Sequence, residues 1–140
     1  MPDVLIVSDA VTVRDEVKAV LEDPGITARE LTRGAEVRGE VERSAPDLVV
    51  LDLQIGKMGG MATCLDLRLE EGAGRLPHVP VLMLLDRRAD VFLAKRSQAE
   101  GWIVKPFDPM RLAKAVKAVL AGGRYEDEAY RPATVTLAAR

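Results

Sequence analysis

The stretch Leu48-Val49-Val50-Leu51-Asp52 is a run of four apolar residues that stops at a carboxylate. A short apolar run without alternation indicates a strand that is buried on both faces, as strands of parallel sheets are. Asp52 then lies at the carboxyl end of that strand, which is the edge of an open α/β sheet where ligands bind. Asp52 is therefore the first candidate functional residue.

Two other apolar runs end in the same way. Residues 4–7 lead into Ser8 and Asp9, and residues 102–104 lead into Lys105 and Pro106. Because the carboxyl ends of parallel strands meet at one edge of the sheet, we expect two carboxylates and one ammonium to converge there.

Apolar strands alternate with helical patterns along the chain, which is typical of βα units wound into a parallel sheet. The chain therefore belongs to the α/β class, with five such units in one domain. The expected strands are residues 4–7, 26–31, 48–52, 81–85 and 102–104, and the expected helices lie at about 13–21, 35–43, 61–71, 89–99 and 109–120. The strand at 26–31 has the weakest pattern, as expected of an exposed edge.

The composition excludes several classes of function. With 140 residues, 20 basic and 22 acidic, the net charge of -2 gives no general attraction to nucleic acid or acidic membranes. No apolar run approaches the roughly 20 residues that span a bilayer, and no leader precedes the first strand, so we expect a cytoplasmic protein without membrane contact. Residues 122–140 are too few for a domain; a mobile tail, a docking segment and a linker stub all remain open.

Two single side chains and one group of basic residues have plain structural interpretations. Cys64 is the single cysteine and falls in an apolar helical pattern, so a core position is favoured over a redox role. His78 has no second histidine or cysteine near it in the sequence, so a surface role is favoured over metal binding. Arg111, Lys114 and Lys117 recur on the last helix and predict a solvated face, although they could also meet an acidic partner.

Together, Ser8-Asp9, the lone Asp52 and Gly101-Trp102-Ile103-Val104-Lys105-Pro106-Phe107 resemble the receiver domain of two-component response regulators, the fold of the chemotaxis protein CheY. The resemblance covers residues 1 to 121. It implies a doubly wound, flavodoxin-like sheet of five parallel strands in the order 2-1-3-4-5. It also implies a phosphoacceptor regulatory domain rather than an enzyme, with at most self-phosphorylation from small donors and autodephosphorylation.

The resemblance assigns a role to each charged residue. Asp52 would accept the phosphoryl group as nucleophile, and Lys105 would contact a phosphoryl oxygen. Asp9, Asp52 and the main-chain carbonyl of Gln54 would hold Mg²⁺, which the charges also require, because a carboxylate must approach a group that is already negative. Ser8 could contribute through a metal-bound water.

Two residues depart from the family pattern. Ser8 stands where a second acid is usual, so the affinity for Mg²⁺ should be weakened. Leu85 stands at the end of the fourth strand in place of the usual Thr or Ser, which should weaken switching. Asp86 follows it and, by strand alternation, is expected to point elsewhere. Trp102 resembles the aromatic residue that swings inward in receivers; with Leu85 beside it, a fixed packing role is favoured.

Two functions therefore remain. The first is a receiver that takes a phosphoryl group from a sensor histidine kinase or phosphotransfer protein and signals to an unknown downstream protein. The second is a pseudo-receiver that acts as a protein-interaction module without phosphorylation. Direct DNA binding is not expected, because no helix-turn-helix unit fits after residue 121. A homodimer could form through the face of the fourth helix, fifth strand and fifth helix.

Overall fold

Four apolar strands form the centre of a parallel sheet in the computed structural model, which describes residues 2–22 and 25–127. These strands are β1 (Asp3–Val7), β3 (Leu48–Asp52), β4 (Val81–Leu85) and β5 (Gly101–Val104). Every residue of β3, β4 and β5 is buried, which is the reason for their continuous apolar sequences. The apolar stretch that ends at Asp52 is thus a central strand, as predicted.

Two less apolar strands complete the sheet. Strand β2 (Thr27–Leu31) pairs only with β1 and is largely exposed, which confirms the predicted edge. The short strand β6 (Tyr125–Glu126) pairs in parallel with β5, so that the observed order is 2-1-3-4-5-6. The predicted order is confirmed for five strands, and the sixth was not foreseen.

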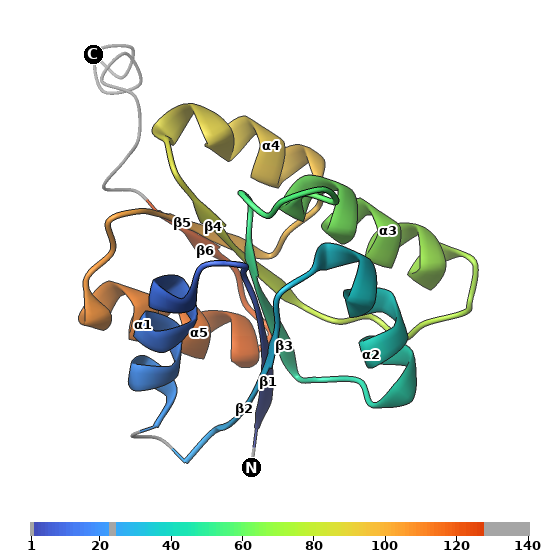
Figure 1. Cartoon of the computed structure of the whole chain (residues 1–140), viewed down its shortest axis with the longest axis horizontal. Helices are drawn as coiled ribbons and strands as arrows, with labels where there is room; N and C mark the ends of the chain where they lie inside the picture. Colours follow the sequence, from blue (N-terminus) through green and yellow to red (C-terminus); the bar gives the residue numbers. More distant parts are fainter. Residues whose placement is uncertain (1, 23–24, 128–140) are drawn as a thin grey trace.

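The helices cover the two faces of the sheet (Figure 1). One face carries α1 (Val11–Leu21) and α5 (Pro109–Leu120), and the other carries α2 (Val37–Arg43), α3 (Gly60–Gly72) and α4 (Val91–Arg96). Single 3₁₀ turns, η1 (Gly34–Glu36) and η2 (Arg88–Asp90), precede α2 and α4. The fourth helix is shorter than the predicted 89–99. No helix within the described ranges is long and apolar enough to cross a membrane.

Strand alternation divides the core into two apolar clusters. One contains β-strand residues that pack under α1 and α5, namely Val4, Ile6, Leu48, Val50, Leu82, Leu84 and Ile103. The other packs under α2, α3 and α4 and includes Leu5, Val7, Val49, Leu51, Val81, Met83, Leu85, Trp102 and Val104. If this two-residue alternation continues past the end of a strand, it determines the face of the sheet on which the next side chain lies.

Residues 125–127, the described end of the segment for which a mobile tail, a docking segment and a linker stub were left open, are joined to the sheet. Asp127 is buried, accepts a hydrogen bond from the Val104 N–H at 3.0 Å and pairs with Arg111 of α5. Arg111 is therefore not part of a simple solvated face, whereas Lys114 and Lys117 are exposed as predicted. The rest of the predicted tail, residues 128–140, lies outside the described residues.

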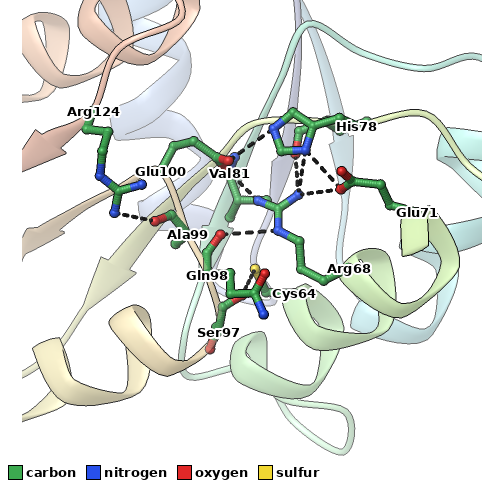
Figure 2. Close-up of polar contacts among 11 residues, drawn as sticks. Cys64, Arg68, Glu71, His78, Val81, Ser97, Gln98, Ala99, Glu100 and Arg124 are labelled. Carbon is green, nitrogen blue, oxygen red and sulfur yellow. Dashed lines mark hydrogen bonds and ion pairs between the residues drawn. The ribbon is translucent and has the colours of Figure 1, made fainter.

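A polar cluster lies where β4 and β5 begin (Figure 2). Because the strands are parallel, this end of the sheet is opposite to the one where Asp52 ends β3. We call Arg68, Glu71, His78 and Glu100 the arginine cluster. Arg68 Nη2 lies 2.6 Å from a Glu100 oxygen, and the two ring nitrogens of His78 lie 2.9 Å from Glu71 and 3.0 Å from Glu100. The predicted surface position of His78 is confirmed, since its side chain is 48% exposed; the side chain also contacts two acids.

Candidate functional site

Asp52 and Lys105 meet at the carboxyl edge of the sheet. The Lys105 N–H donates to the Leu85 carbonyl at 2.7 Å, which continues the β4–β5 ladder by one residue and fixes where the lysine leaves β5. Its Nζ lies 2.8 Å from Asp52 Oδ1. The Asp52 side chain is only 2% exposed, so this charge-assisted contact lies in a largely dry environment. The structure thus brings together two of the three charged residues predicted to converge.

The second oxygen of Asp52 is occupied by Ser8. The Ser8 hydroxyl donates to Asp52 Oδ2 at 2.7 Å and accepts the Ala10 N–H at 3.1 Å. Ser8 is fully buried, and its hydroxyl contacts the acid directly. A hydroxyl has one proton and two lone pairs, and one lone pair remains for a water.

Asp86 belongs to this site, which the sequence-based expectation missed. Its Oδ1 lies 2.9 Å from Lys105 Nζ, so one ammonium joins the carboxylate that ends β3 to the carboxylate that follows β4. The expectation that Asp86 points elsewhere is wrong, because the alternation that carries Leu82 and Leu84 to the α1–α5 face carries Asp86 there too. The usable signal was an acid directly after one strand beside a lysine directly after its neighbour.

Asp9 lies at the rim of the site. Its Oδ2 accepts the Gly56 N–H at 2.9 Å, in the loop between β3 and α3. In the described part of the chain it forms no hydrogen bond or ion pair with Asp52 or Lys105.

The loop between β3 and α3 is closed at Gly60, where a Cβ would stand 2.5 Å from the Asp52 carbonyl oxygen, so only glycine allows α3 to begin so close to β3. We call Asp9, Asp52, Asp86 and Lys105 the acid–lysine cluster.

The ammonium of Lys105 is held in its charged form. Burial by itself lowers the pKa of Lys105, but hydrogen bonds to Asp52 and Asp86 outweigh it and raise the pKa above the usual 10.5. The cluster then contains three acidic side chains and one cation, so acid is in excess by two groups. Such an excess attracts a cation of matching charge.

The donor set of the cluster suits a hard divalent cation. Asp9 and Asp52 supply carboxylate oxygens. Gln54 follows β3, and its main-chain N–H donates to Asp52 Oδ1 at 3.3 Å. Its main-chain carbonyl takes no part in that hydrogen bond. Mg²⁺ needs only one or two carboxylates and retains several waters. Among the described residues there is no group of three His, Cys, Asp or Glu side chains arranged as a cage for a metal. Held by two carboxylates and a main-chain carbonyl, the ion would keep several of its waters.

Leu85, expected to weaken switching, and Trp102, for which a fixed packing role was favoured, are both in the core. Leu85 is fully buried in the apolar cluster under α2, α3 and α4, and it has no hydrogen-bond donor in its side chain. Trp102 is 3% exposed in the same cluster, with its ring 5.8 Å from Lys95 Nζ. The side chain of Leu85 therefore lies on the face of the sheet away from Asp86.

Sequence comparison connects this geometry to known proteins. The family model of the response regulator receiver domain matches residues 4–117. The chain is 33% identical over 127 residues to the DNA-binding response regulator MtrA of Mycobacterium tuberculosis, covering 89% of this chain and 52% of the relative. It is 33% identical over 122 residues to the DNA-binding dual master transcriptional regulator RpaA of Synechocystis, covering 86% and 49%. The chain thus spans about half the length of the curated relatives it matches.

Solved structures show the same fold. The chemotaxis response regulator CheY4 of Vibrio cholerae superimposes with a TM-score of 0.75 at 27% identity, covering 85% of this chain and 98% of that one. The receiver domain of NtrX from Brucella abortus gives a TM-score of 0.74, also at 27% identity with 85% and 98% covered. Nearly the whole of each receiver is therefore matched.

Proposed function

Because the chain belongs to the response regulator receiver domain family, we propose that it accepts a phosphoryl group on Asp52 in a Mg²⁺-dependent reaction. The family is regulatory, and the chain is a receiver domain of the two-component type. The observation that carries the proposal is the 2.8 Å contact between Lys105 Nζ and Asp52 at the carboxyl edge of the sheet. This edge is where α/β folds place their chemistry.

Each residue has a defined part in the transfer. An Asp52 oxygen forms a bond to phosphorus while the bond from phosphorus to the donor breaks, and the electron pair of that bond leaves with the donor. Lys105 balances negative charge and donates to a phosphoryl oxygen. Ser8 holds the acid in place through Oδ2, and the transfer needs positioning and charge neutralisation more than covalent catalysis.

Asp9, Asp52 and the Gln54 carbonyl are the residues that would hold Mg²⁺, with Ser8 as an outer contact through a water. When bound, the ion neutralises the phosphoryl group that a carboxylate must approach. Ser8 brings no charge to this set, so we expect weaker binding of the ion than a second acid at that position would give.

The partners follow from the proposed chemistry. A sensor histidine kinase or phosphotransfer protein would supply the phosphoryl group, and a downstream protein would bind the phosphorylated domain. The relatives named above are DNA-binding regulators over a length about twice that matched here. A homodimer through the face of α4, β5 and α5 would use the helices and not the backbone of β5, because β6 already pairs with that strand.

Mass spectrometry of the intact protein tests this function. The protein is incubated with Mg²⁺ and acetyl phosphate and compared with Asp52→Asn and with Asp47→Asn, which removes an acid outside the site. We expect one added phosphoryl group in the wild type and in Asp47→Asn and none in Asp52→Asn. Labelling of Asp52→Asn equal to wild type would overturn Asp52 as the acceptor.

One observation favours the pseudo-receiver as a second candidate. The Asp52 side chain is 2% exposed, and both of its oxygens already accept hydrogen bonds, from Lys105 and Ser8. Leu85 also offers no hydroxyl to the site. If neither acetyl phosphate nor a kinase labels the protein, the site is a structural polar core, and the domain acts through protein contacts alone.

A further inference from the structure

Lys105 has two acidic partners of nearly equal distance. Its Nζ lies 2.8 Å from Asp52 and 2.9 Å from Asp86. The two acids differ in exposure, with the Asp52 side chain 2% exposed and that of Asp86 37% exposed. The solvent-facing side of the ammonium is therefore occupied by a carboxylate that the proposed acceptor role of Asp52 does not use.

Asp86 also changes the distribution of charge. Ser8 supplies no charge beside Asp52, whereas Asp86 adds one on the β4 side, in contact with the lysine. An incoming phosphoryl group carries about two negative charges and would seek the same ammonium. A carboxylate already bound there competes with the phosphoryl group for the Lys105 ammonium and repels it, and this repulsion acts only on a charged ligand.

We propose that Asp86 is a positioning residue that shares Lys105 with Asp52 and, by competing for the ammonium, opposes the arrival of a phosphoryl group at Asp52. The proposal rests on the proposed function of Asp52 as phosphoacceptor. It deepens that function by naming an internal anion that sets how readily the site is phosphorylated. Leu85, the neighbour of Asp86, is buried on the other face and takes no part.

The first test measures the rate of phosphorylation. Wild type, Asp86→Asn, Asp86→Ala and Glu42→Gln are labelled with acetyl phosphate and Mg²⁺ and followed by intact mass. Glu42 is an exposed acid of α2 and serves as the matched loss of one charge. Removing a unit charge close to the phosphoryl site should speed labelling at least about threefold in both Asp86 variants, with less effect at high salt. Glu42→Gln should match the wild type.

The second test does not depend on phosphorylation. Urea midpoints are compared for wild type, Asp86→Asn, Lys105→Met and the double variant. If the two residues share a contact, their shifts are not additive: the shift that Asp86→Asn causes in the wild type disappears in the Lys105→Met background. Additive shifts would overturn the sharing of Lys105.

The two failures can be distinguished. Asp86 variants that label on Asp52 at the wild-type rate would overturn the competition and leave the acceptor role standing. If every variant stays unlabelled, the acceptor role fails, and the urea cycle alone decides whether Asp86 holds the lysine. Slower labelling in both Asp86 variants would also contradict the proposal, because it would make the acid a helper of the transfer.

Discussion

The two ends of the sheet hold polar clusters that differ in how completely their charged groups are partnered. At the carboxyl edge, Asp52 and Asp86 share Lys105 while Asp9 lies at the rim, and at the amino edge Arg68 and His78 face two glutamates. The arginine cluster is saturated: each guanidinium nitrogen of Arg68 has a carboxylate or carbonyl partner (Figure 2). A cluster whose donors are all partnered stabilises the fold, whereas a cluster with an acid outside its ion pairs, as Asp9 is among the described residues, can attract a cation.

The largest expected effect is the loss of Arg68. Its side chain is 8% exposed and supports the carbonyls of Val79 and Gln98 as well as Glu100. Arg68→Met leaves those groups without a donor, so the free energy of unfolding should fall by about 2 to 4 kcal/mol in urea titrations.

The matched control is Arg38, an arginine of α2 that pairs with Asp66 while its own side chain is 51% exposed. Arg38→Met should change stability by less than about 1 kcal/mol, because exposed ion pairs contribute little. Equal effects of the two substitutions would show that the arginine cluster is an ordinary surface network, and the contrast between the two ends would be lost.

The burial of Cys64 on α3 gives a pH-dependent prediction. Burial raises the pKa of the Cys64 thiol from 9.0 to about 11. The unfolded thiol ionises first, so stability is complete below pH 9 and declines as the pH rises from there towards 11. Between about pH 8 and about pH 10 the wild type should lose about 1 kcal/mol more than Cys64→Ala in urea titrations. Parallel losses would mean that water reaches the thiol.

The smallest expected effect is at Asp52. Asp52→Asn removes one charge from a cluster with excess acid while an oxygen remains to accept the Ser8 hydroxyl. We expect stability to stay unchanged or to rise by up to about 1 kcal/mol, as is common where a site is built for function rather than stability. A loss above about 2 kcal/mol, measured by thermal and urea unfolding, would place Asp52 among the structural residues instead.

The sequence was sufficient for most of the fold because its signals are local. Unbroken apolar runs marked β3 and β4, and Asp108 with Pro109 marked the start of α5, where the Asp108 carboxylate accepts the Arg111 N–H at 2.7 Å. The buried position of Cys64 was confirmed for the same reason. Strand β6 was missed because two residues carry no periodic pattern, and its anchor, Asp127, pairs with Arg111 across 16 positions.

The site was predicted in part for a different reason. Asp52 and Lys105 each end an apolar strand, so topology alone brings them together. Asp86 was misassigned because alternation was counted relative to Leu85, although the whole pattern of β4 places it with Asp52. The partners of His78 are Glu71 on α3 and Glu100 just before β5. Contacts between such separate elements cannot be predicted from residue spacing in the sequence.

The most direct test of the contrast between the two clusters is an NMR titration with Mg²⁺ and beryllofluoride, an analogue of a phosphoryl group, observed at backbone amides. The account predicts large shifts at residues 8–10, 52–56, 86–87 and 105, and unchanged signals at Arg68, His78 and Glu100. Shifts confined to the arginine cluster, or none at the carboxyl edge of the sheet, would contradict it.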